Sequence, residues 1–148
     1  MEKVKQVLVW RKDLNCRKGK LISQCSHASL AVILNMMKKF KHEQEQSIFK
    51  RMFNRIVKLF WCYSLVFEEG SYLDQWFNGK FTKITVSCKD EQELLDLYKQ
   101  AKDAGIPCVL ITDAGLTEFN GVPTNTCIAI GPFWNEEIDK ITKHLPLL

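Results

Sequence analysis

Residues 90–115 read DEQELLDLYKQAKDAGIPCVLITDAG and join an amphipathic helix directly to an apolar strand. Asp90 and Glu93 have the spacing of a capping box, and Gly105 follows the last helical turn. A buried stripe recurs at helical spacing between them, formed by Leu94, Leu97, Tyr98 and Ala101. The apolar run IPCVLIT at 106–112 then predicts a strand. A helix that leads at once into a strand favours an α/β fold.

The segments on either side extend this pattern. Strands are predicted at 4–10, 81–88 and 126–131, and helices at 20–42, at 47–60 and after Pro132 and Asn135. The loop EFNGVPTN at 118–125 permits a hairpin between the last two strands. The order is therefore strand, helix, helix, strand, helix, strand, strand, helix. It predicts a single compact α/β domain over 1–148, with a four-stranded mixed sheet flanked by helices.

The first two predicted helices carry much of the positive charge. Lys38, Lys39 and Lys41 fall in the expected last turns of the helix at 20–42, the end that the helix dipole favours for cations. Residues 1–60 hold fourteen Lys and Arg against four Asp and Glu, a net of +10, whereas residues 61–148 hold seven against thirteen, a net of −6. This split indicates either a basic face for an acidic partner such as nucleic acid, or a solvated surface whose charges cluster in sequence.

The hydrophobic runs and the cysteines of the sequence argue against a membrane protein, a secreted protein and a metal site. The longest apolar run, at 59–67, is too short to span a bilayer, and the first residues do not resemble a signal peptide, so we expect a cytoplasmic protein without a membrane partner. The six cysteines, at 16, 25, 62, 88, 108 and 127, form no CxxC pair. This favours buried reduced thiols over a metal site or a disulfide framework.

The stretch GKLISQCSHAS at 19–29 places a thiol beside an imidazole on a predicted helix. At about 100° per residue, Cys25 lies about 160° around the helix from His27, within the apolar stripe. Cys25 is thus expected to pack in the core and not to act as a nucleophile. Lys20, Gln24 and His27 instead share one polar stripe, within about 60° of one another. That stripe starts beside a basic loop, and Asp113 follows the carboxyl end of an apolar strand, so together they suggest a site.

Five segments resemble the archaeal and eukaryotic, or type II, peptidyl-tRNA hydrolases. They are VLVWRKDL at 7–14, KGKLISQCSHAS at 18–29, Trp76 with Gly79, TDAGLTE at 112–118 and TCIAIGP at 126–132. The resemblance implies a compact α/β homodimer that cleaves the ester between a peptide and the 3′ ribose of tRNA. It also implies peptidyl-tRNA as the partner, and no metal or organic cofactor.

The resemblance, taken with the needs of ester hydrolysis, assigns roles to particular residues. Asp113 would orient or deprotonate water, Lys20 would stabilise the developing negative charge, and Gln24 with Thr117 would position the ester. His27 is either a proton carrier or a structural residue near the site. Three cations are expected to meet tRNA phosphates, namely Arg11, Arg17 and Lys18.

Two departures from the family pattern leave alternatives open. Leu116 and Glu118 stand where the family usually has Arg and Gln, which should weaken phosphate contact nearby. The segment between His27 and Trp76 is also longer than the family pattern, which predicts a helical insertion around 43–70. An RNA-binding or protein-interaction module with a decayed site, and a hydrolase of another acyl ester or amide, therefore remain alternatives to a peptidyl-tRNA hydrolase.

Overall fold

The computed structural model describes residues 4–41 and 61–148. Its elements in chain order are β1 (Val4–Arg11), α1 (Lys18–Met36), β2 (Lys38–Lys41), β3 (Trp61–Ser64), α3 (Tyr72–Phe77), β4 (Lys83–Cys88), α4 (Glu91–Asp103), β5 (Cys108–Asp113), β6 (Thr124–Trp134) and α5 (Asn135–Thr142). They fall into two compact units, Met1–Leu34 with Phe67–Leu148, and Asn35–Val66. The larger unit contains the four strands predicted from the sequence.

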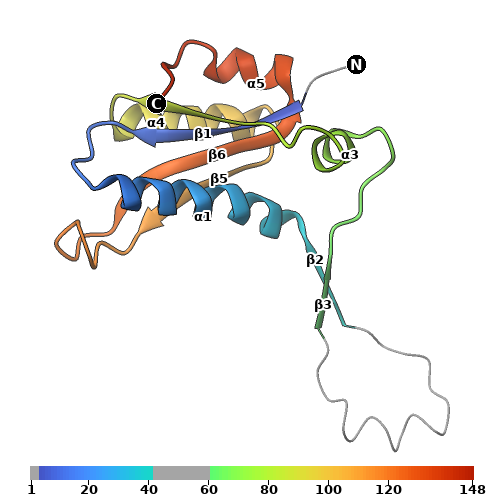
Figure 1. Cartoon of the computed structure of the whole chain (residues 1–148), viewed down its shortest axis with the longest axis horizontal. Coiled ribbons are helices and arrows are strands. Elements are labelled where there is room, and N and C mark those ends of the chain that lie inside the picture. Colours follow the sequence, from blue (N-terminus) through green and yellow to red (C-terminus); the bar gives the residue numbers. More distant parts are fainter. Residues whose placement is uncertain (1–3, 42–60) are drawn as a thin grey trace, which may run out of the picture. The chain divides into compact units, whose positions relative to one another are not determined.

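The larger unit is built on a four-stranded mixed sheet with the order β4-β1-β6-β5 (Figure 1). Strand β1 pairs parallel with β4 and antiparallel with β6, and β5 pairs antiparallel with β6. Three strands therefore run in one direction, and their carboxyl ends meet at one edge of the sheet. The mixed four-stranded α/β fold predicted from the sequence is confirmed, as is the hairpin between its last two strands.

Helices cover both faces of this sheet, because alternate residues of each strand point to opposite sides. On one face Val7 and Val9 pack in a core with α4 and α5. On the other, Leu8 and Trp10 pack against α1. Figure 1 shows α1 on one side of the sheet and α4 with α5 on the other. The sheet thus holds α1 by an apolar stripe and leaves its polar stripe free to build a site.

Helix α4 begins at the predicted N-cap Asp90, in an arrangement close to a capping box in which Glu93 reaches the amide just before the N-cap. Asp90 Oδ1 accepts a hydrogen bond of 2.9 Å from the Glu93 amide, and Glu93 Oε2 accepts one of 2.6 Å from the Lys89 amide. The helical stripe also lies where the periodicity placed it, with Leu94 and Leu97 almost fully buried. Local sequence signals were sufficient for this helix because its caps and its apolar face agree.

The first helix ends earlier than predicted. We expected it to reach His42, but α1 ends at Met36, and residues Lys38–Lys41 form β2. The partner of β2 is β3, in an antiparallel pair that aligns Lys39 with Tyr63. The lysines expected in the last helical turns are therefore in a strand. Pairing with a segment some twenty residues further along the chain overrode the local helical pattern.

Two predicted features fall wholly or partly on residues 42–60, which lie outside the described ranges. The helix predicted at 47–60 lies outside the described residues, and the insertion around 43–70 stays a prediction.

Helix α3 was not predicted; its N-cap is Ser71, whose side chain accepts a hydrogen bond from the Asp74 amide. None of the helices in the described ranges is both long enough and apolar enough to cross a membrane.

Candidate active site

The candidate site forms where the first turn of α1 meets the carboxyl end of β5. Asp113 is the last residue of β5, and Lys20 lies in the first turn of α1. The Lys20 ammonium is 2.6 Å from Asp113 Oδ2 and 3.1 Å from Thr117 Oγ1. The Lys20 and Asp113 side chains are each only 13% exposed. The structure therefore brings a partly buried cation and carboxylate together across 93 residues of sequence.

The Asp113 carboxylate accepts three hydrogen bonds. Besides Lys20, the Gln24 amide nitrogen donates to Oδ2 at 2.7 Å, and the Gly115 backbone amide donates to Oδ1 at 2.9 Å. These donors, above all the Lys20 ammonium, hold the pKa of Asp113 below its ordinary value, against the opposing effect of partial burial. Asp113 is consequently an ionised anchor at neutral pH and a weak proton acceptor.

Thr126 contacts the Gln24 amide group on the side away from Asp113. Gln24 and Thr126 are buried, and the Thr126 hydroxyl lies 3.1 Å from Gln24 Oε1 and 3.2 Å from the Ile111 carbonyl. Thr126 reaches this position because strand pairing skips it: Ile111 pairs with Cys127, and Thr112 with Asn125. Because the ionised Asp113 carboxylate can only accept, the Gln24 atom that faces it is the amide nitrogen, and Gln24 Oε1 faces the Thr126 hydroxyl.

The loop after β5 needs a glycine directly behind Asp113. Gly115 has a φ of 81°, in the left-handed region, and a Cβ there would lie 2.3 Å from the Val122 carbonyl oxygen. Glycine alone permits this close approach. The tight turn returns the chain so that Thr117 faces Lys20, and the Phe119 ring centroid lies 5.6 Å from the Lys20 ammonium.

The second half of the polar stripe does not join the cluster. His27 is exposed on α1, and no hydrogen bond to it is present within the described ranges. Cys25 is 6% exposed and packs with Ala28 and Val32, as the helical geometry predicted. The structure therefore unites Lys20, Gln24, Asp113 and Thr117, and leaves His27 at the surface without an assigned partner.

Arg11 is bound internally and does not face solvent as a phosphate contact would. Its guanidinium donates to both carboxylate oxygens of Asp13, at 3.1 and 2.8 Å, and to the Asn125 carbonyl at 2.8 Å. Glu91 lies 3.1 Å from it as well, and the Arg11 side chain is only 9% exposed. These contacts raise the pKa of Arg11 and lower that of Asp13. These contacts favour a role for Arg11 in holding the ends of β1 and β6 together, while its contact with a tRNA phosphate stays a prediction.

Arg17 and Lys18 are exposed where α1 begins. The Arg17 side chain is 82% exposed, and its Nε donates to Glu118 Oε1 at 2.9 Å. Glu118 Oε2 also accepts from the Arg17 backbone amide at 2.9 Å. The backbone amide and the guanidinium of Arg17 both lower the pKa of Glu118. The acid that departs from the family pattern thus pairs with a cation of this chain.

The sequence indicated four of the clustered residues and missed two that support them. Thr126 and Phe119 carried no functional expectation, although both lie in segments that were quoted for the family resemblance or for the hairpin loop. A polar residue in the apolar run TCIAIG was the available signal for Thr126. Within the described ranges, no three His, Cys, Asp or Glu side chains gather closely enough to hold a metal ion.

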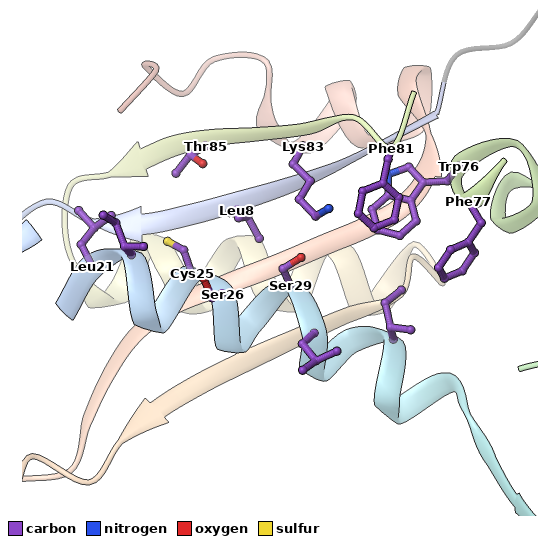
Figure 2. A pocket seen from close by; sticks show the side chains of 13 residues that line it. Leu8, Leu21, Cys25, Ser26, Ser29, Trp76, Phe77, Phe81, Lys83 and Thr85 are labelled. Carbon is purple, nitrogen blue, oxygen red and sulfur yellow. The ribbon is translucent and has the colours of Figure 1, made fainter. Parts of the chain in front are cut away.

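A groove of about 510 Å³ lies on the other side of α1 (Figure 2). Its walls are mostly apolar and include Leu8 of β1, Leu21 and Cys25 of α1, and the Trp76 and Phe81 rings. Two further lining residues, Ile22 and Leu30, are 63% and 59% exposed. The groove contains none of the clustered residues, so α1 separates it from the candidate active site.

The chain is similar to known proteins over nearly its whole length. Residues 4–148 match the family described as Peptidyl-tRNA hydrolase PTH2. A relative named Peptidyl-tRNA hydrolase, from Methanopyrus kandleri, is 37% identical over 144 residues, covering 97% of each chain. Another of that name, from Thermococcus onnurineus, is 34% identical over 150 residues, with both chains fully covered. A Dictyostelium discoideum protein named Probable peptidyl-tRNA hydrolase 2 is 34% identical over 97% of this chain and 54% of its own length.

Proposed function

Because the chain belongs to the peptidyl-tRNA hydrolase PTH2 family, we propose that it hydrolyses the ester between a peptide and the 3′ ribose of tRNA. The observation that carries the proposal is the cluster of Lys20, Gln24, Asp113 and Thr117 at one edge of the sheet. An assembled cluster with a partly buried ion pair supports a working hydrolase over a decayed site. The reaction consumes one water and gives a peptide carboxylate, a free ribose hydroxyl and a proton.

Lys20 is the residue proposed to stabilise the transition state. Attack of water on the ester carbonyl places negative charge on the carbonyl oxygen, and a preorganised cation lowers that barrier. The ammonium is held by Asp113 and Thr117, so it needs little reorganisation when the charge develops. The bond between the carbonyl carbon and the ribose oxygen then breaks, and the ribose oxygen takes a proton that derives from the attacking water.

Asp113 is proposed to orient the site and not to remove the proton by itself. Its low pKa makes it a poor base near neutral pH, while its three donors fix it in place. A water hydrogen-bonded to this carboxylate would be aligned toward the ester. Gln24 and Thr117, each in contact with Lys20 or Asp113, are proposed to position the ester.

Contact with the tRNA backbone is proposed for Arg17 and Lys18, which are exposed beside the cluster. Phosphate contacts release counterions, so binding through these residues weakens as salt rises. Work on tRNA in translation also makes the cytoplasm the proposed compartment. We leave Arg11 out of this proposed surface because Asp13, Glu91 and Asn125 already bind its guanidinium.

Association of two copies is a further part of the proposal. The exposed apolar side chains of Ile22 and Leu30, at the groove beside α1, support it, since a two-fold dimer places the same patch of each copy together. The small side chain of Ser26, which lies between them and is exposed, allows close approach of a second helix. Sedimentation equilibrium checks this point: a dimer is expected, and Leu30→Glu should shift it toward monomer.

The test of the activity is the release of free tRNA from an N-acetylated aminoacyl-tRNA by the purified protein. Release by the wild type well above the Asp113→Ala background is expected. If the two rates are equal, the proposed function is wrong. A parallel reaction with a small N-acetylated amino-acid ester shows whether the tRNA moiety is required, which separates this activity from general ester hydrolysis.

A further inference from the structure

Helix α1 begins without a capping box of its own. The Arg17 carbonyl accepts from the amides of Lys20 and Leu21, at 2.9 and 3.3 Å, so Arg17 is the N-cap residue and Lys18 the first helical residue. In a capping box, the third helical residue is Glu or Gln and accepts from the N-cap amide. Here the third residue is Lys20, whose side chain is committed to Asp113 and Thr117. The first turn contains no acidic residue.

Glu118 supplies the missing carboxylate from a distant part of the chain. Its Oε2 accepts from the Arg17 backbone amide at 2.9 Å, the contact that a capping box makes locally, and its Oε1 accepts from Arg17 Nε at 2.9 Å. The Glu118 side chain is only 12% exposed. A negative charge here also opposes the concentration of cations at the positive end of the α1 dipole, where Arg17, Lys18 and Lys20 stand.

The contact joins the two segments that build the active site. Glu118 directly follows Thr117 in the loop after β5, and Arg17 directly precedes α1. Glu118 therefore ties the loop to the backbone at the start of the helix, whereas Asp113 and Thr117 contact the Lys20 side chain. We propose that Glu118 is a positioning residue for hydrolysis, which fixes the first turn of α1 so that the Lys20 ammonium stays at Asp113.

The proposal rests on the hydrolase activity proposed above, and three variants test it in the same tRNA-release assay. Glu118→Ala removes the cap and should lower kcat about tenfold or more with little change in KM, because small displacements of catalytic groups are costly. Glu118→Gln keeps an oxygen that accepts from the Arg17 amide, so it should restore most of the kcat that the alanine variant loses. Glu93→Ala removes a carboxylate–amide contact at the start of α4, to the Lys89 amide, and should leave kcat near the wild-type value.

A second readout does not depend on turnover. Amide hydrogen exchange at Arg17 and in the first turn of α1, measured by NMR without substrate, should speed up in Glu118→Ala, with protection largely restored in Glu118→Gln. Wild-type protein that releases no tRNA would refute the proposed function, while this exchange measurement would still test the cap. The inference is overturned if Glu118→Ala keeps the wild-type kcat, if its loss falls wholly in KM, or if Glu118→Gln is as impaired as Glu118→Ala.

Discussion

Replacing Lys20 with methionine tests the centre of the proposed mechanism. Methionine keeps much of the side-chain length and its packing but removes the ammonium that lies 2.6 Å from Asp113 Oδ2 and 3.1 Å from Thr117 Oγ1. Loss of one preorganised donor to a developing oxyanion costs about 10²- to 10³-fold in kcat, or about 3 to 4 kcal/mol. We expect a loss of this size in single-turnover release of tRNA.

The same variant has a second expected effect. The Lys20 ammonium is the largest cause of the low pKa of Asp113, so Lys20→Met should raise that pKa, as measured by carbon-detected NMR of the Asp113 carboxyl. Asp113 keeps its hydrogen bonds from Gln24 and Gly115, so we expect a modest loss of stability, about 1 to 2 kcal/mol. Both measurements are independent of the catalytic assay.

Lys99→Met is the matched control, since Lys99 is exposed on α4, on the other face of the sheet. It should leave kcat and stability near the wild-type values. A Lys20→Met enzyme whose kcat is indistinguishable from that of Lys99→Met would refute the assignment of Lys20 to transition-state stabilisation. A normal pKa of Asp113 in the wild type would refute the electrostatic part of the reasoning.

Three further outcomes are expected. Thr126→Val should leave the buried Gln24 oxygen without a donor, which costs about 1 to 3 kcal/mol in unfolding free energy and lowers kcat, whereas Thr126→Ser keeps the hydroxyl; equal behaviour of the two variants would contradict this. Arg11→Met should destabilise the fold by about 2 kcal/mol in urea titration, because its partners lose their cation but stay partly hydrated. Its affinity for tRNA should not change, and a selective loss of tRNA binding would show that Arg11 does contact phosphate. The lowered pKa of Asp113 means that its ionised form adds stability above the unfolded-state pKa of about 4, and that this contribution is lost as the pH falls through the folded-state pKa. The acid limb of kcat/KM due to Asp113 should therefore lie below about pH 4, and a limb near neutrality would assign the titration to another group.

The sequence predicted correctly the helices and strands for which capping residues, turn residues and hydrophobic periodicity indicated the same element. The caps and apolar stripe of α4 and the apolar runs of β1 and β5 are visible in the sequence, and the structure forms them there. The predicted end of α1 was wrong because residues 38–41 form a strand that pairs with β3, and no short window of sequence contains both strands. Helix α3 was missed because it has only six residues and little periodicity.

For the candidate site, too, the sequence predicted the side chains whose placement depends on local spacing and not those whose placement depends on tertiary contacts. Helical spacing was enough to place Cys25 in the core and Lys20 with Gln24 on one polar face. It could not distinguish an exposed His27 from one in the cluster, because that depends on how far the loop after β5 extends along α1. It also could not show that Arg11, a cation expected to meet tRNA phosphates, is enclosed by Asp13 and Glu91.

By itself, the sequence determined the α/β class, the strands of the central sheet and the polar stripe of α1, because helix and strand periods are properties of neighbouring residues. Only the tertiary structure decided which groups complete the site. Thr126 reaches Gln24 because the pairing of β5 with β6 skips one residue, and a bulge of this kind reverses the side to which a strand residue points. Glu118 caps α1 from 101 residues away, a contact that exists only once the sheet has brought the end of β5 beside the start of α1.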